Sequence, residues 1–181
     1  MKFSILLLAA ACGGSSSAQR AAVTGKVGGV AVTASNAAAV AFTVGGKPAV
    51  DILISNAADG CAGNDANLKS RQSLSLGLAS LSGAALDGGD YGVYDQSGGN
   101  VPQGDVAFVD WHTSDTACAN TTPANAVGAS GRVTLSRIAL TGADAGVTGD
   151  FDLLLENGDR LKGTFDAPLC ASAVQSDAGC H

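Results

Sequence analysis

The most chemically mixed stretch of the sequence is residues 110–115, which place an indole, an imidazole, two hydroxyls and two carboxylates within six positions. Within it, His112 has the side chain of a general base, and a serine nucleophile would need such a base together with a carboxylate. However, the chain contains no G-x-S-x-G nucleophile motif, and Gly128-Ala129-Ser130-Gly131 is one residue too short for it. The sequence therefore predicts no catalytic residue, and we expect a protein without enzymatic activity.

Trp111 and His112 are better candidates for binding than for catalysis. Aromatic residues make up only 4% of the chain, and Trp111 is its single tryptophan. We expect Trp111 to pack near a strand end. If it were exposed beside Tyr91 and Tyr94, the three rings would instead form a platform on which sugar rings could stack.

Acidic residues alternate in the C-terminal third of the chain. Asp150 and Asp152 are two positions apart, so on a strand both point to the same face, with Asp159 and Asp166 on its predicted partner. Such carboxylates could bind Ca²⁺ or act as an acid and a base. A solvated outer face opposite Phe151 explains the same pattern without a ligand, because antiparallel sheets commonly have one polar face. We favour the solvated face and keep Asp150 and Asp152 as candidate binding residues.

The five cysteines indicate disulfide bonds once Cys12, which lies near the N-terminus, is set apart. Cys61, Cys118, Cys170 and Cys180 remain, and an even number in an exported chain is typical of two disulfides. Three pairings are possible, and we favour Cys61–Cys118 with Cys170–Cys180, the first of which would tie the long loops 57–71 and 113–130 together. A zinc site is not expected, because no C-x-x-C motif occurs and the chain has two histidines.

The elements that must position these residues are strands. Apolar residues recur with a period of two, and no stretch offers a capped helix with an apolar face; residues 34–41 are ambiguous and could form one helical turn. We predict a single domain from residue 21 to 181, an all-β antiparallel sandwich or partly closed barrel of about eight to ten strands. Its strands are expected at residues 23–27, 30–32, 40–44, 50–55, 72–78, 91–94, 106–111, 132–140, 147–155 and 160–165.

Two turns are predicted with particular clarity. Gly45-Gly46 separates two short apolar runs, and Asn157-Gly158 separates two alternating runs. Both dipeptides favour the positive φ angles that two-residue hairpin turns need. The sequence therefore predicts hairpins at both places.

The N-terminus has the order of parts of a secretory signal, with one lysine, a short apolar run and then small residues. Leu8-Ala9-Ala10-Ala11-Cys12 resembles the lipobox of bacterial lipoproteins, although Ala9 stands where leucine is usual and the signal is short. The resemblance implies a signal peptide at residues 1–11, lipidation of Cys12 and a flexible Gly/Ser tether through residue 20. The open alternative is cleavage after Ala18, which would remove Cys12 and release the protein.

Three further motifs resemble a strand triplet of uncharacterised bacterial lipoproteins of the type abundant in myxobacteria. They are Gly131-x-Val133-Thr134-Leu135, Gly149-x-Phe151-Asp152-Leu153 and Gly163-x-Phe165-x-Ala167-x-x-Cys170, and the segment from Ile54 to Cys61 matches the same group. The resemblance covers most of the mature chain. It implies an all-β fold and export, and it carries no activity or catalytic residue.

The composition limits the partners. A formal net charge of −6, with 14% charged residues, argues against nucleic-acid binding and against electrostatic docking on anionic lipid. We therefore expect a cell-envelope protein held at the membrane, most simply the outer membrane, by its lipid, or a periplasmic or secreted protein if Cys12 is removed. Its expected role is a non-enzymatic binding or structural module without a cofactor, with an envelope protein or a glycan as partner. An envelope hydrolase or a calcium- or carbohydrate-binding domain stays open as the alternative.

Overall fold

The computed structural model describes residues 20–62, 67–98, 104–170 and 180. The predicted signal peptide 1–11, Cys12 and the tether as far as residue 19 lie outside these residues. No helix in the described part of the chain is long and apolar enough to cross a membrane.

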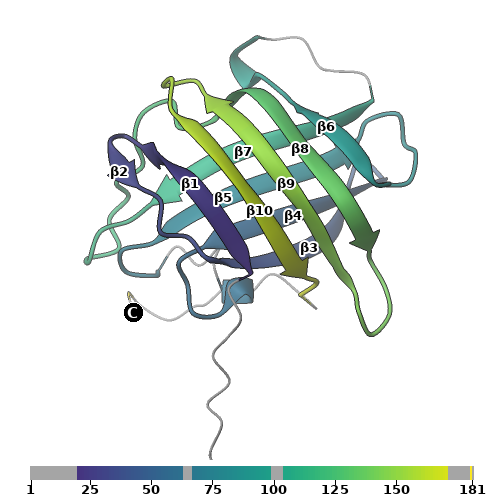
Figure 1. The fold of residues 1–181 in the computed structure, drawn as a ribbon, viewed down its shortest axis with the longest axis horizontal. Coiled ribbons are helices and arrows are strands. Elements are labelled where there is room, and N and C mark those ends of the chain that lie inside the picture. The colour runs from purple at the N-terminus through teal and green to yellow at the C-terminus, as the bar shows by residue number, and fades with distance from the viewer. Residues whose placement is uncertain (1–19, 63–66, 99–103, 171–179, 181) are drawn as a thin grey trace, which may run out of the picture.

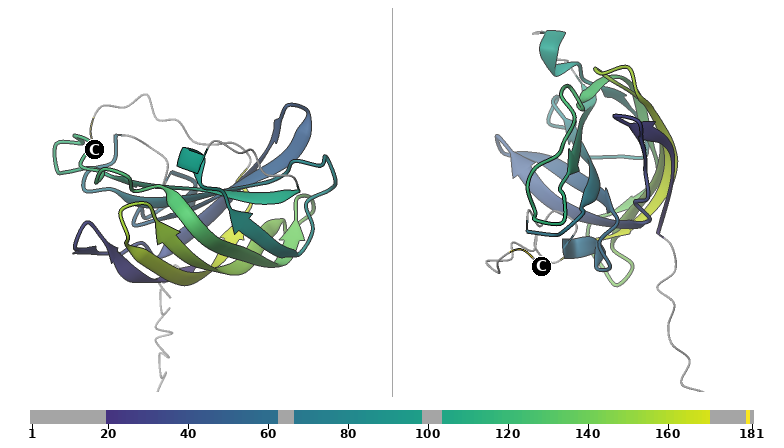
Figure 2. Two further views of the ribbon diagram at one scale, coloured as in Figure 1. Left: turned by 90° about the horizontal axis from the view of Figure 1, so that it is seen from above. Right: turned by 90° about the vertical axis from the view of Figure 1, so that its left-hand side faces the viewer.

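Ten strands form a single sheet that curls strongly on itself into a half-barrel (Figures 1 and 2), which confirms the all-β, partly closed barrel predicted from the sequence. The order across the sheet is β2-β1-β10-β9-β8-β6-β7-β5-β4-β3. The strands are β1 (Ala21–Val27), β2 (Val30–Ala31), β3 (Asn36–Val44), β4 (Lys47–Ser55), β5 (Gln72–Ser80), β6 (Gly89–Val93), β7 (Asp105–Thr113), β8 (Gly128–Ala139), β9 (Gly146–Leu155) and β10 (Arg160–Pro168), with short 3₁₀ turns η1 (Gly60–Ala62) and η2 (Gln96–Gly98).

Both predicted hairpin turns are present. Gly45 and Gly46 join β3 to β4 with φ angles of +58° and +79°, which suit a residue without Cβ. Gly158 has a φ of +86° between β9 and β10, and the side chain of Asn157 accepts a hydrogen bond from the Asp159 amide in the same turn.

The structure differs from the sequence-based expectation in two elements. Residues 36–44 form a full strand, where the alanine-rich segment 34–41 left a helical turn open, because β3 pairs with β4 along its whole length. In addition, β6 pairs in parallel with β7 while it is antiparallel to β8, so the sheet is mixed and not wholly antiparallel.

The core lies on the concave face of the curled sheet, between its two halves. Alternate residues of β4 and β5 point into it and face those of β9 and β10. Its fully buried members include Ile52, Leu76, Leu153 and Leu161. Because side chains alternate along a strand, the residues between them form the convex outer face, where a functional site can be exposed.

The four remaining cysteines do form two disulfides, but the predicted pairing is wrong. The bonds join Cys61 to Cys170 and Cys118 to Cys180. The curl of the sheet explains the first bond: it brings the end of β10 against β3, where Leu169 forms a parallel bridge with Ala39 and the Cys170 amide donates a 2.8 Å hydrogen bond to the Ala39 carbonyl. Cys61 lies in η1, which packs on the same strand. Two disulfides are typical of an oxidising, extracytoplasmic compartment.

Candidate functional site

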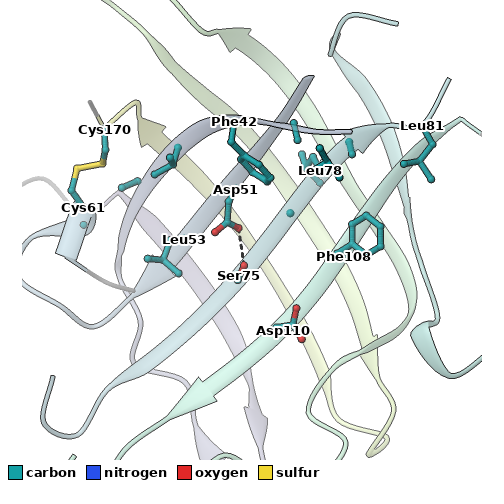
Figure 3. A pocket seen from close by; sticks show the side chains of 17 residues that line it. Phe42, Asp51, Leu53, Cys61, Ser75, Leu78, Leu81, Phe108, Asp110 and Cys170 are labelled. Carbon is teal, nitrogen blue, oxygen red and sulfur yellow. Dashed lines mark hydrogen bonds between the residues drawn. A yellow bond between two sulfur atoms is a disulfide. The ribbon is translucent and has the colours of Figure 1, made fainter. Parts of the chain in front are cut away.

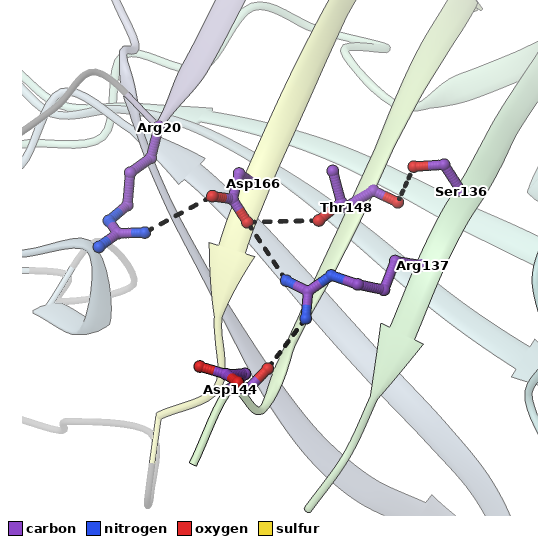
Figure 4. A network of polar contacts seen from close by, with 6 residues as sticks. All are labelled: Arg20, Ser136, Arg137, Asp144, Thr148 and Asp166. Atoms are coloured by element: carbon purple, nitrogen blue, oxygen red, sulfur yellow. Dashed lines mark hydrogen bonds and ion pairs between the residues drawn. The ribbon is translucent and has the colours of Figure 1, made fainter. Parts of the chain in front are cut away.

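The outer face of the sheet has two chemically different halves. Over β1, β10, β9 and β8 it is polar, and Figure 4 shows the network at one end of this half. Asp166 lies between two arginines, 3.8 Å from Arg20 Nη1 and 3.6 Å from Arg137 Nη2, and accepts a 3.3 Å hydrogen bond from Thr148 Oγ1. These side chains are about half exposed, so the network is a solvated surface of modest energetic value.

Asp150 and Asp152 lie on this polar half, as expected for a solvated face. Asp152 accepts a 2.7 Å hydrogen bond from Lys162 Nζ, which lowers the pKa of the Asp152 carboxyl, and Asp150 is exposed. Asp166 lies on β10, two residues beyond Thr164, which pairs with Asp150. Asp159 lies in the turn before β10. Within residues 20–62, 67–98, 104–170 and 180, no three acidic, histidine or cysteine side chains gather closely enough to hold a metal ion.

The other half of the outer face, over β3, β4, β5 and β7, is largely apolar and is hollowed into a groove of about 510 Å³ (Figure 3). We call it the outer groove. Its apolar lining comes from all four strands and from the residue after β5, and includes Val40, Phe42, Leu53, Ala79, Leu81 and Phe108. Two carboxylates, Asp51 and Asp110, interrupt this lining.

The strand register explains why the sheet is hollow here. Across the sheet, Val40 pairs with Asp51, Asp51 with Gly77, and Gly77 with Phe108. Gly77 has no side chain, and a Cβ placed on it would meet only Phe108, at 3.7 Å from its Cβ and 3.9 Å from its carbonyl oxygen. The floor of the outer groove is therefore lowest at Gly77, with room for a ligand atom in place of a side chain.

The two ends of the outer groove are built differently. At one end, Phe42 and Val44 of the β3–β4 hairpin expose 44% and 51% of their surface, while Phe108 packs edge-on against Tyr94 with ring centroids 5.6 Å apart. At the other end, the Cys61–Cys170 disulfide and Gly60 close the groove. The outer groove is therefore closed by a disulfide at one end and is apolar and exposed at the other.

Asp51 is the carboxyl group on the floor of the outer groove, beside Gly77. Burial raises the pKa of its carboxyl, and the neighbouring charge of Asp110 raises it further. Ser75 Oγ opposes this shift by donating a 2.7 Å hydrogen bond to Asp51 Oδ1, and the charge of His112 also lowers the pKa. The result is a partly desolvated carboxyl group on an apolar floor.

No cation of the described chain lies within 4.0 Å of the two carboxylates of the outer groove, although the charge of His112 acts on Asp51 from a greater distance. The ion pairs among the described side chains involve Asp152 and Asp166 on the polar half, and neither Asp51 nor Asp110. Lys47, on the neighbouring hairpin, donates its ammonium group to the carbonyl of Leu81.

The aromatic residues singled out from the sequence do not form a sugar-stacking platform. Trp111 is 3% exposed and Tyr91 is 1% exposed, and both pack in the core, so that alternative is wrong. Trp111 does lie near the end of β7, as expected. His112 is exposed on the outer face of β7, two residues beyond Asp110, and is the one predicted binding residue that lies beside the outer groove.

The described part of the loop 57–71 meets the loop 113–130 at one end of the sheet, although no disulfide joins them. Ser114 Oγ donates to the Leu68 carbonyl at 2.6 Å and accepts from the Arg71 amide at 3.0 Å, and the Ser70 amide donates to the Asp115 carbonyl at 2.8 Å. The sequence analysis predicted that a Cys61–Cys118 disulfide would join these two segments. Hydrogen bonds join them instead.

Sequence reasoning missed the outer groove and its key residues, Asp51, Ser75, Gly77 and Phe108. One signal was available: Asp51 is the only charged residue in the run Val50-Asp51-Ile52-Leu53-Ile54, and a charge inside an apolar strand calls for a structural or functional explanation. The other groove residues lie on strands β5 and β7, and the sequence around Asp51 does not show that these strands are its neighbours.

Comparison of the chain with protein-family models, curated proteins and solved structures found no match. The geometry and chemistry of the outer groove are therefore the basis on which a function can be assigned.

Proposed function

We propose that this protein is an exported, lipid-anchored binding protein of the cell envelope that holds an apolar ligand in the outer groove and catalyses no reaction. The observation that carries the proposal is the contrast between the two halves of the outer face. One half carries the ion pairs of Asp152 and Asp166, and the other presents an apolar groove.

The dimensions and exposure of the outer groove support a ligand site. Its volume of about 510 Å³ falls within the range of small-molecule sites, roughly 300–1,000 Å³. Phe42 and Val44 expose apolar surface to water at its rim, and covering such surface stabilises a complex by about 25 cal/mol per Å² before the costs of binding. A ligand with an apolar body would therefore gain affinity from a surface that already exists in the free protein.

The envelope location rests on two independent features. The two disulfides favour an extracytoplasmic compartment, and the segment ending in Cys12 resembles a lipobox. Lipid on Cys12, followed by the Gly/Ser tether, would hold the β-domain close to the membrane, most simply the outer membrane. Labelling of producing cells with a palmitate analogue should tag the protein, and Cys12→Ser should abolish the tag. An untagged wild-type protein whose mature N-terminus is Gln19 would disprove the anchor.

Binding in the outer groove can be tested with the uncharged fluorescent probe N-phenyl-1-naphthylamine. We expect saturable fluorescence enhancement with the wild-type protein. Gly77→Val should weaken binding at least about tenfold, because its side chain fills the floor of the groove while valine suits a strand. Gly92→Val is the matched control, since Gly92 lies on β6 outside the groove and a Cβ placed on it would have no atom within 4 Å.

The two possible results separate clearly. Equal binding by wild type and Gly77→Val, or no saturable binding by the wild type, would contradict the proposal. Loss in Gly77→Val with retention in Gly92→Val would locate the ligand on the floor of the outer groove.

A further inference from the structure

We infer that the ligand of the outer groove is an amphipathic organic cation, a small molecule with an apolar body and a protonated amine that pairs with Asp51 and Asp110. The inference rests on the proposed function and adds the chemical class of the ligand. It follows from the charges of the groove, from the geometry around Asp51 and from the contrast with the polar half of the sheet.

The charges of the outer groove are incomplete within the described structure. Asp51 and Asp110 are its charged lining residues, and both are acidic. On the polar half, by contrast, Asp152 has Lys162 at 2.7 Å and Asp166 has two arginines within 4 Å. Asp152 and Asp166 are thus paired with cations on the solvated half, whereas Asp51 and Asp110 have no ion pair where the surface is apolar and desolvation costs more.

The geometry around Asp51 leaves room for a donor from a ligand. Ser75 occupies Oδ1 through its 2.7 Å hydrogen bond, and Oδ2 has no hydrogen-bond partner in the described part of the chain. Asp110 lies directly opposite Ser75 in the strand register, so the two carboxylates flank the serine. An ammonium group has three donors and can bond to Asp51 Oδ2 while it remains within the field of Asp110.

A cation fits this site better than a neutral or an anionic ligand. Burial penalises the ionised form of Asp51, and a bound cation would return the stabilisation that the carboxylate loses when it leaves water. Two carboxylates would repel an anion at the same place, and the net charge of −6 favours the approach of cations over anions. The apolar lining then accepts the rest of the molecule.

Three probes with one fluorophore test this inference. Dansylcadaverine carries a primary ammonium, its N-acetyl derivative is neutral, and dansyl-6-aminohexanoate is anionic. With the wild-type protein at pH 7.5, we expect the cation to bind at least about tenfold more tightly than the neutral probe, with the anion weakest, because charge-assisted hydrogen bonds are the stronger class.

Variants locate the source of this preference. Asp51→Asn keeps the size of the side chain and should clearly reduce the preference for the cationic probe, and Asp51→Asn combined with Asp110→Asn should bring the cationic and neutral probes to similar affinities. Asp150→Asn removes the same charge from the polar half and should leave the preference unchanged. Gly77→Val should weaken all three probes.

The outcomes distinguish the ligand class from the proposed function. If the neutral probe binds the wild type as tightly as the cation, and Gly77→Val still abolishes binding, the cationic class is wrong and the apolar binding function stands. If none of the three probes binds while N-phenyl-1-naphthylamine does, the inference alone fails; if N-phenyl-1-naphthylamine does not bind either, both proposals fail. A cation preference that is unchanged in Asp51→Asn would place the cation away from Asp51 and would also overturn the inference, whether or not Asp150→Asn removes it.

Discussion

Ser75 reaches Asp51 diagonally across the β4–β5 pair, through a 2.7 Å hydrogen bond from Ser75 Oγ to Asp51 Oδ1. The two residues are not direct neighbours in the register, since Asp51 pairs with Gly77 and Ser75 pairs with Leu53. The direct neighbour of Asp51 has no side chain, so the serine is the hydroxyl available to its carboxylate on this face. Gly77 therefore has two effects: it deepens the outer groove, and it leaves Ser75 as the hydrogen-bond donor to Asp51.

The first prediction concerns this hydrogen bond. Ser75→Ala removes the largest influence that lowers the pKa of Asp51, so this pKa should rise further above its ordinary value. Titration of the Asp51 carboxyl carbon by NMR measures the change. Ser136→Ala is the control, because Ser136 Oγ donates to the Thr148 carbonyl on the polar half. An unchanged or lower Asp51 pKa in Ser75→Ala would show that the bond does not stabilise the ionised carboxylate.

The second prediction is a dependence of stability on pH. The Asp51 pKa is raised in the folded state above its ordinary value of 3.8, so between these two values the folded protein binds more protons than the unfolded chain. Its contribution to the free energy of unfolding therefore falls as pH rises through that window and stays low above it. Asp51→Asn lacks this decline, so the stability of Asp51→Asn relative to wild type should increase from pH 3 to pH 7 in urea denaturation.

Asp152→Asn gives a control of opposite sign. Lys162 lowers the pKa of Asp152, so the contribution of Asp152 to stability is present above the unfolded pKa and is lost as pH falls. The stability of Asp152→Asn relative to wild type should therefore decrease from pH 3 to pH 7. Both variants are compared with wild type at each pH, which removes the titrations that all three proteins share. Parallel pH profiles for Asp51→Asn and wild type would contradict the assignment.

Local sequence signals predicted the strands and turns well because their causes are local. Glycines at 45, 46 and 158 take positive φ angles that few other residues adopt, and their positions mark hairpins whatever the rest of the fold does. The strand at 36–44 was ambiguous because alanine favours helices, whereas Asn36 and the flanking β-branched residues do not. Its conformation is determined by pairing with β4, which the alanine pattern does not reveal.

The disulfide pairing and the outer groove depend on contacts between distant segments. Cys61 and Cys170 meet because the curled sheet places β10 beside β3, and a linear pattern does not contain that curl. Likewise, Ser75 and Asp110 have the pattern of ordinary polar residues on an outer face, and only the charge of Asp51 inside an apolar run stands out. They become a site only because the order β7-β5-β4-β3 surrounds them with apolar neighbours.

The third prediction separates the core from the rim of the outer groove. Leu76 is fully buried at the centre of β5, so Leu76→Ala should lower the free energy of unfolding by about 2–5 kcal/mol. Phe42 is 44% exposed, so Phe42→Ala should cost clearly less stability and should instead weaken binding of the neutral naphthyl probe. Urea denaturation and probe titration on both variants check this division. A larger loss of stability in Phe42→Ala would mean that Phe42 belongs to the core.

The fourth prediction concerns the two disulfides, which should differ in their effect on binding more than in their effect on stability. The bonds close segments of 109 and 62 residues, and the loop-entropy difference between such lengths is only about 0.5 kcal/mol. Removal of either bond, by Cys61→Ser with Cys170→Ser or by Cys118→Ser with Cys180→Ser, should therefore cost roughly 2–5 kcal/mol. Only the Cys61–Cys170 bond lines the outer groove, where it fastens η1 beside the contact between Ala39 and Leu169.

Loss of the Cys61–Cys170 bond should thus also weaken binding of the naphthyl probe, measured in folded protein well below the denaturation midpoint. Loss of the Cys118–Cys180 bond should leave that affinity close to wild type and serves as the matched control, since neither of its cysteines lines the groove. Peptide mapping of the oxidised wild-type protein by mass spectrometry must first find both bonds in this pairing. Equal weakening of binding by the two double variants would show that general loosening of the sheet, and not the closed end of the outer groove, controls affinity.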